Sequence, residues 1–180
     1  MREVSTLLVK MVCVLSLCGA VVYADTQKNT AAPTDPQIVK VLEVVNDGEI
    51  KASELAERSG NHDVKVFAQN MIEAHRQSNT DATALARTLS FKSDDSQISD
   101  DLRKESKDDL QKLKTLKGAA FDKAYVNTLV GAHETALDTL NNTLIPSAKN
   151  AQLKKLLVDT RAVVESHLEH ARELQTALNK

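Results

Sequence analysis

The sequence contains few of the residues that form tight turns, strands or aromatic binding surfaces. Its 180 residues include five glycines, three prolines, three phenylalanines, two tyrosines and no tryptophan. Alanine, leucine, valine, lysine, glutamate and aspartate dominate instead, a composition that favours one all-α domain. The 23 basic and 25 acidic residues are mixed along the chain. Because there is no basic or aromatic-rich segment, we expect no nucleic-acid partner.

Cysteine is also scarce, and both copies, Cys13 and Cys18, lie near the amino terminus. An apolar run over residues 11–22 follows two basic residues there and ends in the small-residue pattern Val22-Tyr23-Ala24. The run is too short for a membrane span, so we interpret residues 1–24 as a secretory signal peptide. Its removal leaves a mature chain without cysteine, disulfide or transmembrane segment and with a net charge of about −3.

The predicted location is the periplasm, with association with the outer membrane as an open alternative. A lipoprotein acylated at Cys18 is disfavoured, because Leu17 stands where a small residue is normally required. Residues 25–35 are polar and aperiodic, which predicts a flexible linker before a domain over residues 36–178. Nothing in the sequence identifies a protein partner.

Apolar residues recur every three or four positions in four long segments, which predicts four amphipathic helices. The expected helices run from Asp35-Pro36 to Gly60, from Asn61 to about Ser90, from about Ala119 to Ile145 before Pro146, and from Asn150 to about Leu178. Asp35 is the expected cap of the first helix. The short turns near Gly60 and Pro146 predict two antiparallel hairpins, and therefore an up-down four-helix bundle.

A weaker helix is expected over residues 99–117, between the two hairpins. It could be the long crossover found between the second and third helices of ferritin-like bundles, or an extra helix on one side. Asn46-Asp47-Gly48 could end the first helix as a turn, but the apolar spacing continues through it, so we predict one helix. Gly48 would then permit close helix approach, at a cost of about 1 kcal/mol relative to alanine.

Four ionisable residues, one on each long helix, lie on faces that should be buried: Glu49, His75, His133 and His167. Each is near the middle of its helix, so the four can share one central layer. Burying an unpaired carboxylate costs several kcal/mol, which a metal ion or a protonated histidine would remove. We therefore predict these four residues as ligands of a single transition-metal ion, either zinc, iron or manganese. The alternative is a metal-free, hydrogen-bonded polar layer that sets the packing register.

Two further residues lie near this predicted layer in the sequence and could belong to it. Tyr125 lies two turns before His133 and is expected in the core with its hydroxyl hydrogen-bonded. His170, one turn beyond His167, is a candidate fifth ligand, although a solvated position suits it better.

Three blocks of residues, in order, resemble the exported bacterial proteins of the domain-of-unknown-function 4142 (DUF4142) family. The resemblance covers about residues 36–178 and rests on Glu49, Leu55-Ala56, Val64, Phe67-Ala68, Met71-Ile72 and His75, then Phe121-Asp122, Tyr125 and His133, then His167-Leu168 and Ala171. It implies a ferritin-like four-helix bundle in the periplasm or at the outer membrane, and no established activity. Members are often labelled outer-membrane proteins.

The sequence departs from di-iron bundles, which carry Glu-x-x-His on two helices. The residues three before the histidines are Ile72, Val130 and Val164, so a mononuclear site is expected, without iron storage or oxygen activation. Phosphate-binding glycine loops and the Gly-x-Ser-x-Gly elbow are also missing, which favours a non-enzymatic protein. Two functions stay open: a metal-binding bundle, or a metal-free structural, interaction or stress-related helical module.

Overall fold

The computed structural model describes residues 32–180. The predicted signal peptide and all but the last residues of the predicted linker lie outside the described residues. Every regular element in residues 32–180 is helical, as expected. The elements are α1 (Asp35–Ala56), α2 (His62–Thr88), α3 (Gln97–Lys114), α4 (Gly118–Thr139), the π-helix η1 (Leu140–Leu144), α5 (Ile145–Ser147) and α6 (Ala151–Leu178).

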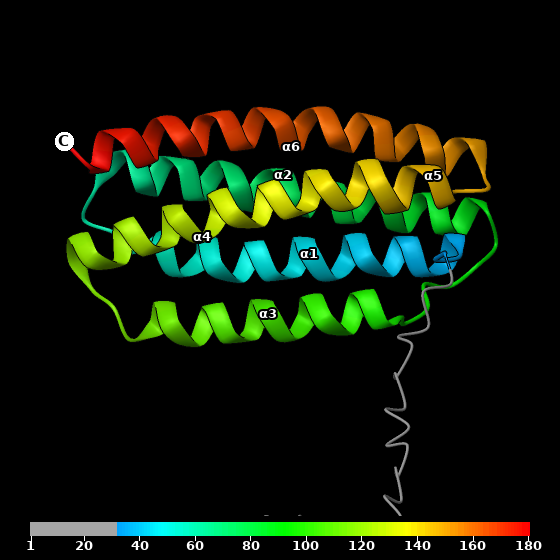
Figure 1. Ribbon diagram of the computed structural model, residues 1–180, viewed down its shortest axis with the longest axis horizontal. Coiled ribbons are helices and arrows are strands. Elements are labelled where there is room, and N and C mark those ends of the chain that lie inside the picture. The colour runs from blue at the N-terminus through cyan, green and yellow to red at the C-terminus, as the bar shows by residue number, and fades with distance from the viewer. Residues whose placement is uncertain (1–31) are drawn as a thin grey trace, which may run out of the picture. The chain divides into compact units, whose positions relative to one another are not determined.

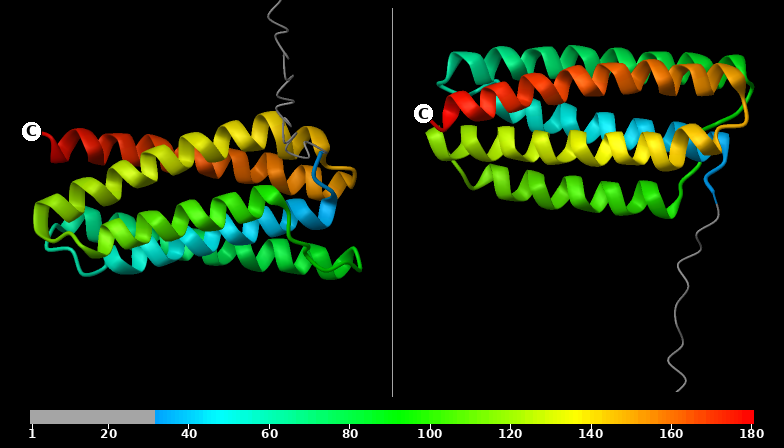
Figure 2. Two further views of the ribbon diagram at one scale, coloured as in Figure 1. Left: turned by 60° about the horizontal axis from the view of Figure 1, so that its bottom comes forward. Right: turned by 45° about the horizontal axis from the view of Figure 1, so that its top comes forward.

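The helices form two antiparallel hairpins, α1 with α2 and α4 with α6 (Figure 1). In the sequence between the two hairpins, α3 runs back along the bundle beside α1, so that α2 and α4 point in the same direction (Figures 1 and 2). The fold is therefore a ferritin-like four-helix bundle with an additional helix in the second connection. Both interpretations of that segment hold, because α3 makes the crossover and also packs along α1 as a fifth helix.

Polar side chains define where most helices begin. Asn61 Oδ1 accepts the backbone N–H groups of residues 63 and 64, and Asn150 Oδ1 accepts those of residues 152 and 153. Ser96 caps α3, which therefore begins two residues earlier than expected. The expected cap of α1 is wrong: Thr34 holds that position, one residue before Asp35.

Asp35 has a different role, because its carboxylate reaches the turn before α6. It accepts the backbone N–H groups of Lys149 and Asn150 at 2.8 and 2.9 Å. These bonds join the start of the first hairpin to the second. The helix also continues two residues beyond the expected stop at Ile145, to Ser147. A proline ring clashes with the carbonyl four residues earlier in a regular helix, and the wider π-turn just before Pro146 relieves that clash.

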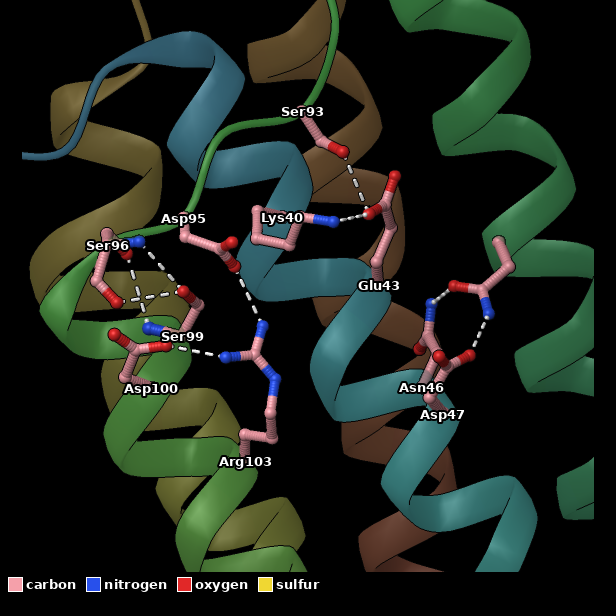
Figure 3. A network of polar contacts seen from close by, with 11 residues as sticks. Lys40, Glu43, Asn46, Asp47, Ser93, Asp95, Ser96, Ser99, Asp100 and Arg103 are labelled. Atoms are coloured by element: carbon pink, nitrogen blue, oxygen red, sulfur yellow. Dashed lines mark hydrogen bonds and ion pairs between the residues drawn. The ribbon is translucent and has the colours of Figure 1, made fainter.

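A network of polar contacts links the segment between α2 and α3 to both α1 and α3 (Figure 3). Glu43 on α1 accepts hydrogen bonds from Ser93 Oγ at 2.9 Å and from Lys40 Nζ at 2.7 Å. Arg103 on α3 bridges Asp95 and Asp100. Exposed ion pairs of this kind contribute about 0–1 kcal/mol each, so they orient the crossover more than they stabilise it.

A layer of polar residues divides the apolar core into two clusters. One cluster lies toward the turn between α1 and α2 and contains Phe67, Met71, Tyr125 and Leu129. The other lies toward the opposite end and is built from Ile38, Val39, Val41, Leu42, Leu140, Leu144, Leu153 and Leu157. Fully burying each large aliphatic side chain contributes about 1.5–3 kcal/mol, so the two clusters hold the polar layer in place. No helix within residues 32–180 has the length and apolarity needed to cross a bilayer.

Candidate metal centre

The structure brings Glu49, His75, His133 and His167 together at the middle of the bundle, one residue each from α1, α2, α4 and α6. Glu49 Oε2 lies 2.8 Å from His75 Nε2 and 3.4 Å from His133 Nε2. His133 Nε2 lies 3.4 Å from His167 Nδ1. The nearest nitrogens of the three imidazoles all lie within 4.8 Å of one another. The predicted central layer is therefore present.

Burial differs among the four side chains. His133 is 1% exposed, and Glu49 and His75 are each 6% exposed, whereas His167 is half-buried. The first three are largely shielded from water, so their polar atoms depend mainly on contacts within the protein. His167 is the one member of the layer that solvent reaches readily.

A chain of hydrogen bonds between α1 and α2 fixes the proton on His75. The carboxylate of Asp47 accepts from Asn79 Nδ2 at 2.9 Å, which leaves Asn79 Oδ1 to accept from Asn46 Nδ2 at 2.8 Å. Asn46 Oδ1 is then free to accept from His75 Nδ1 at 2.9 Å. Figure 3 shows Asn46 and Asp47 side by side on α1. Neutral His75 therefore carries its proton on Nδ1 and presents the lone pair of Nε2 to Glu49.

The backbone fixes the proton on His133. Its Nδ1 lies 2.9 Å from the carbonyl oxygen of Leu129, one turn earlier in α4. A carbonyl can only accept, so His133 Nδ1 donates and Nε2 is unprotonated in the neutral ring. That lone pair faces Glu49 Oε2 and His167 Nδ1.

Several lone pairs thus converge on one small space. Glu49 Oε2 and His75 Nε2 are buried and have no hydrogen-bond partner, although they lie 2.8 Å apart. In a tetrahedral zinc site with bonds of 2.0–2.1 Å, neighbouring ligand atoms are about 3.3 Å apart. Three of the separations, 2.8, 3.4 and 3.4 Å, lie near that value, and the nitrogens of the three histidines all lie within 4.8 Å of one another. The donor set and its spacing fit one divalent transition-metal ion.

The pKa values of the layer also suit metal ligation. Burial alone would raise the pKa of Glu49, but His75, His133 and His167 outweigh burial and hold that pKa below its ordinary value. Burial, followed by the neighbouring His75 and His133, lowers the pKa of His167 to about 4. At neutral pH, Glu49 is therefore ionised and His167 is neutral, which are the forms that bind metals.

Tyr125 is a core residue, as the sequence predicts. Its hydroxyl lies 2.9 Å from Ser53 Oγ, and burial raises its pKa. His170 is exposed, and its ring lies edge-on to Phe67 at 5.0 Å between centroids, away from the three clustered imidazoles.

Sequence reasoning missed the supporting role of Asn46. It considered this residue only as part of a turn, yet Asn46 is 4% exposed and donates to Ser78 Oγ at 3.0 Å as well as to Asn79. Its position three residues before Glu49, on nearly the same helix face, is the signal that could have identified it. The expected close approach at Gly48 is present, and the partner is Ser106 on α3, whose Cβ would lie 3.0 Å from an added Cβ.

The comparisons with known proteins agree with this architecture. The model of the DUF4142 family, a domain of unknown function, matches residues 21–174. The chain belongs to the DUF4142 family. No curated protein matches this DUF4142 chain. The crystal structure of a Streptomyces coelicolor DUF305 protein, named as a secreted protein, is similar with a TM-score of 0.68. The two chains are 12% identical over 81% of this chain and 93% of that one, a likeness of fold alone.

Proposed function

We propose that this DUF4142 protein binds one divalent transition-metal ion between Glu49 Oε2, His75 Nε2, His133 Nε2 and His167 Nδ1. The observation that carries the proposal is that Glu49 Oε2 and His75 Nε2 lie 2.8 Å apart in the core, both buried and both without a hydrogen-bond partner. Asn46 and the Leu129 carbonyl hold the protons of two imidazoles on the far side of each ring. A cation satisfies all the inward-facing atoms at once.

The ligand set of three imidazoles and one carboxylate suits zinc, iron and manganese. One carboxylate contacts two of the three imidazoles, in contrast to the carboxylate-rich di-iron bundles. Four protein ligands complete a tetrahedral coordination sphere, so the proposed role is metal binding and not catalysis at an open position.

Export to the periplasm is part of this proposal. The charged start, apolar run and small-residue pattern in residues 1–24 support a cleaved signal peptide. The name of the Streptomyces DUF305 relative, a secreted protein, supports it as well. In an exported chain without cysteine, histidine and carboxylate are the metal ligands that remain.

A metal-free structural, interaction or stress-related module is the second candidate. The 2.8 Å approach of His75 to Glu49 would suit an imidazolium–carboxylate pair. One added proton, however, would lie in a contact that forms no hydrogen bond in the present arrangement. The metal-binding bundle therefore accounts for more of the geometry.

The test is elemental analysis and calorimetric zinc titration of the untagged mature protein. We expect one equivalent of metal, lost in His75→Gln and His133→Gln and kept in the exposed control His170→Gln. Circular dichroism would establish that each variant folds. Metal below one equivalent in the wild type, or equal binding in all variants, would support the metal-free module instead.

A further inference from the structure

A cleft of about 650 Å³ opens beside the candidate metal centre, between α1, α2, α3, α4 and α6. We call it the central cleft. Its walls are mainly aliphatic and include Val41, Leu42, Val45, Leu140, Leu144 and Val164. Glu49, His75 and His167 also line it, so the cleft leads to three of the four members of the polar layer.

The charges that line the central cleft have one sign. Besides Glu49, its ionisable carboxylates are Asp81, Glu105, Asp109 and Asp159. Among the described residues that line the cleft, none is lysine or arginine. Lys112 and Lys155 pair with Asp109 and Asp159, but neither lysine lines the cleft.

The acidic residues alone would not indicate a ligand, but the inner wall supplies a second observation. Glu49 Oε2 and His75 Nε2 are buried, lack hydrogen-bond partners and belong to residues that face the cleft. Both atoms bind cations. The cleft therefore has an acidic, solvent-exposed outer part and an inner end where Glu49 Oε2 and His75 Nε2 can bind a metal ion.

We propose that the central cleft is the path by which a divalent cation reaches and leaves the centre, and that the protein is therefore an exchangeable metal carrier. This inference rests on the proposed function. It adds that the ion exchanges with the solvent and is not required for the fold. A cleft with charges of one sign and low-dielectric walls focuses the electric field and raises association rates by about 10–10³-fold. The acidic, mostly aliphatic lining has both properties.

The packing supports exchange in a second way. The apolar clusters on either side of the polar layer are each built from residues of both hairpins. The bundle therefore has a core that does not depend on the ion, unlike small domains that unfold without their structural zinc. We expect the metal-free protein to stay helical and to bind and release metal repeatedly.

The first experiment measures association rates by stopped flow, with Co²⁺ as the probe because its visible absorption reports tetrahedral binding. The cleft variant carries Glu105→Gln, Asp109→Asn and Asp159→Asn. The matched control carries Glu57→Gln, Asp63→Asn and Glu173→Gln, three exposed acids near the bundle end where α1 ends and α2 begins (Figure 1). We expect the cleft variant to associate about tenfold more slowly than wild type at low salt, and the control to change less than twofold.

Salt dependence sharpens this result, because 1 M salt shortens the screening length to about 3 Å. At that salt concentration, the cleft variant and the wild type should bind Co²⁺ at nearly the same rate. Equal rates for wild type, cleft variant and control at low salt would overturn the inference while leaving metal binding intact. Absence of Co²⁺ and Zn²⁺ binding to the wild type would overturn the proposed function itself.

A second variant tests the path by steric means. Gly131 lines the cleft, and a Cβ added there would meet no atom within 4 Å. Gly131→Leu should therefore fold and narrow the cleft. We expect it to slow both Co²⁺ association and chelator-driven release several-fold, with an unchanged equilibrium dissociation constant. Unchanged rates in a folded Gly131→Leu protein would show that metal travels by another route.

Discussion

The two hairpins orient their histidines in the candidate metal centre by different kinds of hydrogen bond. In the α1–α2 hairpin, His75 is oriented by side chains, through Asn46, Asn79 and Asp47. In the α4–α6 hairpin, His133 is oriented by its own helix, through the Leu129 carbonyl. Side-chain support can be removed by one substitution, whereas backbone support persists as long as the helix does. The first hairpin should therefore be the more sensitive to mutation.

The largest effect should come from removing a ligand on either side. We expect His75→Gln and His133→Gln each to weaken zinc binding by more than about 100-fold, because loss of a ligand should exceed the 10–100-fold effect of losing the group that orients it. Competition with a chromophoric chelator would measure both affinities. A loss confined to one hairpin would mean that the other does not supply ligands.

The difference between the two hairpins is tested most directly by changing Asn46, which orients His75, and Leu129, whose carbonyl orients His133. Asn46→Ala should weaken zinc binding by about 10–100-fold, since His75 loses the acceptor that fixes its tautomer. Leu129→Met preserves the backbone carbonyl and nearly the side-chain volume, so it should change affinity by less than about threefold. Equal losses in the two variants, measured in the same competition assay, would contradict the proposed difference.

Glycines on the two hairpins should respond in opposite directions to alanine. At Gly48 the added Cβ would clash with Ser106 on α3, so we expect a loss of about 1–3 kcal/mol in unfolding free energy. At Gly131 nothing lies within 4 Å, so alanine should stabilise the protein by up to about 1 kcal/mol through helix propensity. Urea denaturation of both variants checks this, and stabilisation by Gly48→Ala would show that α3 is held loosely.

The smallest effect should be a pH dependence of the metal-free protein. Folding lowers the pKa of His167 from about 6.5 to about 4, so the unfolded chain binds more protons between these values. Stability should therefore fall as the pH drops from about 6.5 toward 4. Glu49, whose pKa is also lowered, adds a further loss below about 4.5.

Thermal denaturation of the metal-free protein across this pH range would measure the loss. His167→Gln should flatten the part between pH 6.5 and pH 4.5. A profile unchanged by that substitution would show that His167 titrates alike in the folded and unfolded chains.

The sequence predicted much of this architecture because helix formation and burial leave a local, periodic record. Asn61, Gly60 and Pro146 marked the turns closely enough to pair the helices into hairpins. The same spacing identified the four ionisable positions that the structure gathers in one layer. It failed at Asp35, whose partners lie 114 and 115 residues away, and at Pro146, where a π-turn changes the local geometry.

What the sequence alone determined is therefore the set of helices and the polar residues that each must bury. Only the tertiary structure decided that His75 and His133 each turn Nε2 toward Glu49, because this meeting depends on how α1, α2 and α4 pack together. The place of α3 beside α1 and the acidic central cleft were likewise settled by packing between distant segments. The spacing of apolar residues predicts which face of a helix is buried. It does not predict which atoms of the other helices contact that face.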